Sequence, residues 1–133
     1  MVSLPPRSRT VAQEGLLAAA LVAATGSAIS GLYLATGQGL PCPWRALTHT
    51  LCPFCGSTRL GASLLRGDLA SAWAANQFTF LLLLGLAIAS LFWIVELVGG
   101  HALRLHGRLA DQRVWYAVLG FSGVAFAVAR NLS

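Results

Sequence analysis

The chain has no lysine and little charge of either sign. Its 133 residues include nine arginines and four acidic residues, and only 10% of the residues are charged. Soluble domains usually carry about 25% charged residues, so this composition excludes an ordinary soluble domain. The arginines are scattered among loops that flank apolar segments, where anionic lipid head groups are the nearest counter-charge. We therefore expect a membrane partner and no nucleic-acid partner.

The sequence motifs of the common enzyme classes are also missing. The chain contains no Walker phosphate-binding loop, no nucleophile elbow, no pair of catalytic carboxylates and no Rossmann fingerprint. Outside its cysteines, the sequence therefore offers no recognisable catalytic residues. We favour a non-enzymatic role and leave the question of an enzyme open.

Apolar sequence is what the chain has in abundance. It is 56% hydrophobic, with a mean hydropathy of +0.71, and its longest apolar runs cover residues 16–36, 77–99 and 114–129. The first two have the ~20 residues that cross a ~30 Å hydrocarbon core. The third covers about 24 Å, so it must thin the bilayer, extend through Arg130 or lie partly re-entrant. We predict an all-α integral membrane protein with three transmembrane helices and one domain over residues 1–133.

The first apolar run could also be a signal peptide. Arg7 and Arg9 precede it, and small residues at 24–28 could allow cleavage. Its apolar character continues through residues 29–34, which is too long for a typical signal sequence. A retained membrane anchor is the favoured interpretation.

Arginines near the ends of the three runs predict the orientation. With the amino terminus inside, the inner side carries Arg7, Arg9, Arg104, Arg108 and Arg113, and the outer side carries Arg45, Arg59, Arg66 and Arg130. The two sides are nearly equal, but Arg7 and Arg9 lie close to the first run and the loop at 100–113 is compactly basic. We predict a cytoplasmic amino terminus, which puts the connector at 41–76 on the outer face.

The connector carries all three cysteines and strong helix signals. Pro53 directly follows Cys52, and proline suits the first position of a helix. This spacing predicts Cys52 at the N-cap of an amphipathic helix that lies along the membrane interface. Apolar and polar residues then alternate at helical spacing, with Leu60, Leu64 and Leu65 on one side and Arg59, Ser63 and Arg66 on the other.

A second short helix is predicted after the first. Gly67 ends the first helix, Asp68 can cap a helix over residues 69–75, and Asn76 leads into the second membrane span. The connector therefore returns to the membrane through a helix–turn–helix.

The run from Pro41 to Gln77 contains the sequence Cys-Pro-x-Cys-Gly-x-Thr-Arg, which begins at Cys52. This run resembles the signature of the bacterial membrane proteins grouped as domain of unknown function 2752. The matching positions are Cys42, Cys52, Pro53, Cys55, Gly56, Thr58, Arg59, Gly67, Asp68 and Asn76. The resemblance implies a multi-pass protein of a bacterial plasma membrane, and it implies no established activity.

Two positions depart from the family pattern. His49 stands where the family usually has glycine, which argues against a family-wide role for this histidine. Gln77 stands where the family usually has proline, which predicts a continuous helix into the second span.

Three interpretations of the cysteines remain open. Cys52 and Cys55 could form a redox pair, with the pKa of Cys52 lowered by a helix N-terminus and by Arg59, although no βαβ pattern of a thioredoxin-like fold accompanies them. Zinc is the second interpretation: the Cys-Pro-Phe-Cys-Gly run is half of a zinc-ribbon knuckle, and Cys42 with His49 could complete four ligands.

The third interpretation is structural. A disulfide between Cys52 and Cys55, or between Cys42 and one of them, would tie the connector down on an oxidising outer face. Arg59 would then pair with Asp68 or reach the head-group layer. Our leading hypothesis is a non-enzymatic membrane component whose stapled connector binds lipid, a partner membrane protein or a second copy of the chain.

Overall fold

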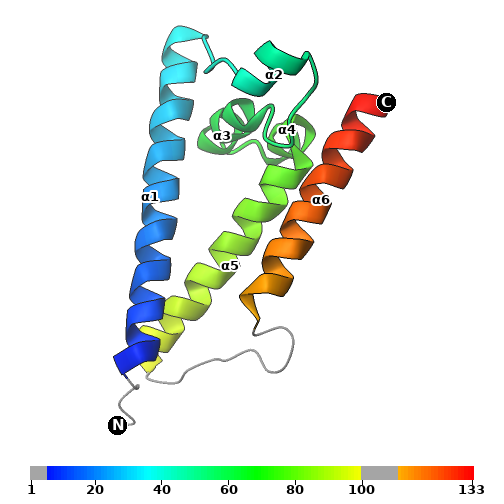
Figure 1. The fold of residues 1–133 in the computed structure, drawn as a ribbon. Helices are drawn as coiled ribbons and strands as arrows, with labels where there is room; N and C mark the ends of the chain where they lie inside the picture. The colour runs from blue at the N-terminus through cyan, green and yellow to red at the C-terminus, as the bar shows by residue number, and fades with distance from the viewer. Residues whose placement is uncertain (1–5, 100–110) are drawn as a thin grey trace.

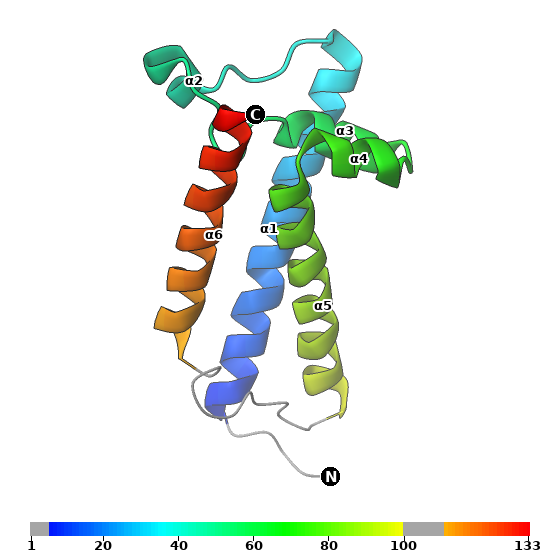
Figure 2. The same ribbon diagram turned by 90° about the vertical axis from the view of Figure 1, so that its right-hand side faces the viewer.

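The computed structural model describes residues 6–99 and 111–133, and every regular element in these ranges is an α-helix. Three long helices are α1 (Pro6–Thr36), α5 (Gln77–Gly99) and α6 (Gln112–Leu132). Three short helices, α2 (Pro43–Thr48), α3 (Ser57–Leu65) and α4 (Leu69–Ala75), gather at one end of the long ones (Figures 1 and 2). The predicted all-α membrane fold is confirmed.

All three long helices are long and apolar enough to cross a membrane. Helix α5 has the bounds that the sequence predicts, whereas α1 begins at Pro6 instead of residue 16. Helix α6 has 21 residues and continues through Arg130 to Leu132. At about 1.5 Å per residue it spans about 32 Å, so it needs neither a thinned bilayer nor a re-entrant path.

Few side chains are buried within the protein itself. The buried apolar residues of the described chain are Ala12, Leu60, Ala62 and Ala72, and none of them lies in α5. Exposing so much apolar surface to water would cost a large free energy, whereas contact with lipid chains avoids this cost. The chain is therefore a multi-pass membrane protein whose spans use lipid as their solvent.

The connector and the end of α6 lie at the same end of the three long helices (Figure 1). The chain passes along α1 to the connector, returns along α5, and comes back along α6, so the carboxyl terminus lies beside the short helices (Figure 1). Which side is cytoplasmic remains a prediction. Arg104 and Arg108, which support it, lie outside the described residues, as do His101 and His106.

Helix α3 lies against α1 at a point where both helices have small residues. Gly61 of α3 is so close to α1 that a Cβ placed on it would run into the hydroxyl of Ser30. Ser30 is buried, and so is the neighbouring Leu60. Small residues allow helix backbones to approach closely in membranes, so this contact seats the connector on the first span.

Gly61→Ala is expected to destabilise the protein by about 1–3 kcal/mol, because it overpacks the α1–α3 contact. Thermal unfolding in detergent measures this effect. Ser30→Gly combined with Gly61→Ala should recover most of the loss. The matched control is Gly85→Ala, since a Cβ on Gly85 meets no other atom within 4 Å. Equal melting temperatures for Gly61→Ala and Gly85→Ala would contradict the close approach.

Candidate functional site: the cysteine cluster and its cavity

Cys52 to Cys55 form a tight turn and not the first turn of a helix. The Cys55 N–H donates to the Cys52 carbonyl at 3.1 Å, and the Ser57 N–H donates to the Phe54 carbonyl at 3.1 Å. Helix α3 begins only at Ser57. The prediction of a helix that starts at Pro53, with Cys52 as its N-cap, is wrong.

Gly56 explains why the helix starts late. Its φ of +93° lies in the left-handed region, so the backbone cannot continue helically from the turn into α3. A Cβ at this position would also lie 2.6 Å from the Ala75 carbonyl oxygen. Glycine is therefore required both by the backbone angle and by the close approach of the end of α4.

The Cys-Pro capping pattern occurs at the other Cys-Pro pair. Cys42 is the N-cap of α2, and Pro43 occupies the first helical position. Helix α2 ends at Thr48, and His49 caps it with a left-handed φ of 56°. The sequence analysis predicted no helix over this stretch, although its Cys-Pro step carries the same signal as Cys52–Pro53.

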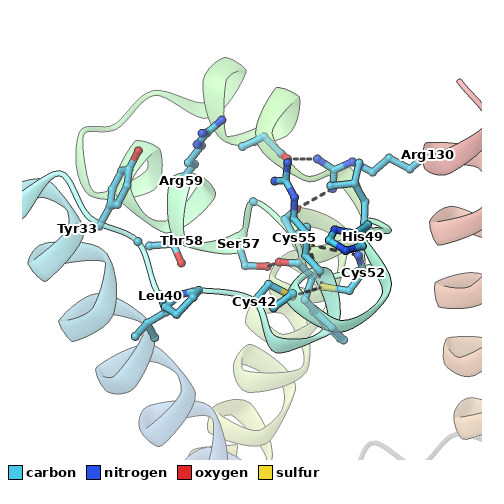
Figure 3. A pocket seen from close by; sticks show the side chains of 18 of the residues that line it. Tyr33, Leu40, Cys42, His49, Cys52, Cys55, Ser57, Thr58, Arg59 and Arg130 are labelled. Carbon is cyan, nitrogen blue, oxygen red and sulfur yellow. Dashed lines mark hydrogen bonds between the residues drawn. The ribbon is translucent and has the colours of Figure 1, made fainter.

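Helix α2 and the turn bring the three cysteine sulfurs together. The Sγ atom of Cys52 lies 3.1 Å from that of Cys55 and 3.4 Å from that of Cys42. All three sulfurs lie within 4.8 Å of one another, and the three thiols are free and partly buried. Among the described residues, no histidine or carboxylate joins this group, so His49 lies nearby without completing it (Figure 3).

The surroundings of the thiols shift two pKa values in opposite directions. The Arg45 backbone N–H, with a smaller effect of the Cys52 thiol, lowers the pKa of Cys42. Burial, together with the Cys55 and Cys42 thiols, raises the pKa of Cys52 to about 11. The expected low pKa of Cys52 is therefore wrong, because this residue does not stand at a helix N-terminus.

The Asn76 side chain hydrogen-bonds to the backbone of the Cys52–Cys55 turn. It is fully buried, and its side-chain amide donates to the Pro53 carbonyl at 2.8 Å and to the Cys55 carbonyl at 2.9 Å. Its side-chain oxygen accepts from the Thr79 N–H at 2.9 Å and so caps α5. Asn76 therefore caps the start of the second span and also holds the cysteine turn.

Residues at the end of α6 also hydrogen-bond to the backbone of this turn and of the residue before it. Arg130 donates to the Cys55 carbonyl at 2.7 Å and to the Ala75 carbonyl at 3.2 Å. Asn131 exchanges two hydrogen bonds with the Leu51 backbone, each at 2.9 Å. The sequence analysis missed both roles, since α6 follows the turn by some 75 to 80 residues. An arginine that ends an apolar run was the only available signal.

The two departures from the family pattern have backbone explanations. His49 occupies a left-handed position that favours glycine. Gln77 is the first residue of α5, where proline also fits. Asn76 between α4 and α5 is extended, with φ −164° and ψ 99°, so the expected continuous helix into the second span is wrong.

Of the remaining connector residues, Gly67 and Asp68 have structural roles and Arg59 lines a cavity. Gly67 makes a turn with φ +75°, and Asp68 caps α4 by accepting from the Ser71 N–H, as predicted. The Ser71 hydroxyl and N–H lower the pKa of Asp68. The expected ion pair between Arg59 and Asp68 does not form in the described part of the chain, and Arg59 instead lines a cavity.

This cavity, of about 880 Å³, lies between the connector, the end of α1 and the end of α6 (Figure 3). The cysteine cluster forms part of its wall. Of the described residues that line it, the charged ones are Arg45, Arg59 and Arg130, and none is acidic. The site thus combines three soft sulfur ligands with a cationic cavity.

Asn76→Ala and Asn76→Asp test how the turn is held. Both remove the donors to the Pro53 and Cys55 carbonyls, and an unsatisfied buried group costs about 1–3 kcal/mol. Asn76→Asp should lower the stability more than Asn76→Ala, because its carboxylate would repel the two carbonyl oxygens. We expect lower thermal stability and faster thiol labelling, with Gln77→Ala as control. Wild-type labelling rates in both variants would contradict this role of Asn76.

His49→Gly tests whether this position matters for its backbone or for its imidazole. A left-handed residue with a side chain costs roughly 1–2 kcal/mol, so the glycine variant should be more thermally stable than the wild type. His49→Ala keeps the strain and should bring no gain. If both variants lose stability equally, the imidazole itself makes the contribution.

A comparison with known protein families matches the family described as "Protein of unknown function (DUF2752)" to residues 42–90. The matched region begins at Cys42, covers the cysteine cluster and helices α2 to α4, and extends into α5. No curated protein and no solved structure matches the chain. The chain is therefore similar to the DUF2752 family over residues 42–90.

Proposed function

We propose that Cys42, Cys52 and Cys55 hold one zinc ion and that the chain is a non-enzymatic membrane component whose zinc-stapled connector binds lipid or a partner membrane protein. The mutual closeness of the three sulfurs carries this proposal. Tetrahedral zinc with Zn–S bonds of ~2.3 Å separates its sulfurs by about 3.8 Å. The observed spacings begin at 3.1 Å and stay within 4.8 Å. A disulfide would use only two of the three sulfurs.

The hydrogen bonds around the sulfurs also support metal binding. Zinc binds thiolates, so groups that stabilise a negative sulfur favour the bound state. The Arg45 N–H directs a hydrogen bond to the Cys42 sulfur and lowers the pKa of that thiol. At Cys52 the Phe54 N–H acts in the same direction, but burial and the neighbouring thiols outweigh it and raise the pKa, so a metal cation would have to stabilise this thiolate. Asn76 and Arg130 fix the turn without any bond to sulfur. The ligands are therefore held in place by the fold.

A fourth zinc ligand would come from the cavity. Zinc in proteins is almost always four-coordinate, and the described residues provide three ligand atoms. Since the sulfurs border the cavity, a water molecule or a bound group can complete the coordination. His49, which also lines the cavity, would reach the sulfurs only after a rearrangement.

A thiol–disulfide oxidoreductase is the less favoured candidate. In a redox pair of Cys52 and Cys55, an attacking Cys52 thiol would need a pKa near or below the ambient pH, whereas burial and the neighbouring thiols raise the pKa of Cys52 to about 11. We further propose a bacterial plasma membrane with the amino terminus in the cytoplasm, as the arginine pattern indicates. The connector would then face an oxidising compartment, where a bound metal protects thiols from oxidation.

Zinc content tests the proposal directly. Protein purified in mild detergent without chelators should contain about one zinc per chain by plasma mass spectrometry. Cys42→Ser, Cys52→Ser and Cys55→Ser should each lose most of it, because each removes one of three protein ligands. His49→Gly should keep its zinc and serves as the control.

Thiol counting in the same sample completes this test. Three unoxidised thiols that become reactive after chelation support the zinc site. A stable disulfide in native membranes, without metal, would refute it. A mixed disulfide trapped specifically in Cys55→Ser would favour the oxidoreductase.

A further inference from the structure

We propose that the cavity beside the cysteine cluster binds the phosphate group of an anionic membrane lipid through Arg45 and Arg59. This inference names a ligand for the connector and does not require the metal. It rests on the charge of the cavity, on hydrogen-bond donors that the fold leaves unused, and on the apolar surface around them.

Charge in this protein is unevenly distributed. In the part of the chain that the structure describes, the cavity is lined by three arginines and by no acidic residue. The chain has four acidic residues. Asp68 is engaged by Ser71 outside the cavity. By the helix bounds, Glu14 lies in the first part of α1, Glu96 near the end of α5 and Asp111 at the start of α6, and these helix ends lie away from the short helices (Figure 1). Among the described residues, no acidic side chain lines the cavity beside its arginines, which favours an anionic ligand.

Two of the three arginines are available for that ligand. Arg130 is committed to the Cys55 and Ala75 carbonyls. The side chains of Arg45 and Arg59 make no hydrogen bond or ion pair within residues 10–99 and 111–133. Thr58, which also lines the cavity, has a hydroxyl without a partner in the same ranges. Guanidinium groups bind phosphate through paired hydrogen bonds.

The position of the cavity selects a lipid over a soluble anion. The cavity is lined by the connector, by Tyr33 near the end of α1 and by Arg130 near the end of α6. These ends of two apolar helices that can cross a membrane lie beside the short helices (Figure 2), where lipid head groups would be expected. Exposed apolar side chains accompany it: Leu40 and Phe54 line it, and Trp44 and Leu47 lie on the adjoining α2. Leu47 is 83% exposed. A cationic centre with apolar borders suits an amphiphile better than free phosphate.

Lipid retention measured by native mass spectrometry tests the inference. Protein in detergent is titrated with phosphatidylglycerol, with phosphatidylcholine as the zwitterionic comparison. Arg45→Gln combined with Arg59→Gln should weaken phosphatidylglycerol binding about tenfold or more, since two charge-assisted contacts are lost. Arg66→Gln is the matched control: Arg66 lies in the same connector and carries the same charge, but it does not line the cavity. It should change binding less than about twofold.

Each outcome has a defined meaning. Equal losses for Arg66→Gln and the double variant would reduce the effect to general surface charge and overturn the inference, as would no preference for phosphatidylglycerol. If millimolar inorganic phosphate displaces the lipid completely and binds as tightly, the site takes free phosphate and the lipid assignment fails. Zinc is measured on the same samples. Arginine-dependent lipid binding without zinc would refute the proposed metal site and leave this inference standing.

Discussion

The Cys55 carbonyl is the point on which the site depends. Two side chains donate to it: Asn76, which directly precedes α5, at 2.9 Å, and Arg130, in the last turn of α6, at 2.7 Å. The Cys55 carbonyl is partly buried, and an unsatisfied buried polar group costs about 1–3 kcal/mol, so these two donors stabilise the turn. One backbone oxygen thereby joins the cysteine turn to α5 and α6. The sulfur positions follow from that junction.

The same junction positions α6 relative to the rest of the protein. Apolar side chains gain little by leaving lipid for another helix, so specific packing and polar contacts determine how spans associate. Phe78 of α5 stacks on Phe126 of α6 with ring centroids 5.7 Å apart, and the Arg130 guanidinium lies 5.7 Å from the Phe126 ring. These contacts all lie in the part of α6 nearest the connector. The connector is therefore both the candidate site and the clamp that holds the third span.

Local sequence signals predicted the elements whose causes are local. Residues 77–99 are predominantly apolar, and Asp68 with Gly67 marks the start of α4, so both helices were predicted with their observed bounds. The turn at Cys52 was predicted wrongly, because its conformation depends on the left-handed Gly56 and on the distant Ala75 carbonyl. Arg130 and Asn131 were missed for the same reason. No periodicity or capping rule connects residues that lie 75 to 80 positions apart.

The charges of the two proposed ligands are compatible in one site. Three thiolates around one Zn²⁺ leave about one negative charge, and a single nearby cation can balance it. Arg130 is suited to this role, because its guanidinium is already fixed on the Cys55 carbonyl beside the sulfurs. Arg45 and Arg59 then remain for a second anion, and a phosphate diester carries the single charge that they can neutralise. A cavity with only Arg130 would suit the metal alone; the two further arginines are the reason to expect a lipid beside it.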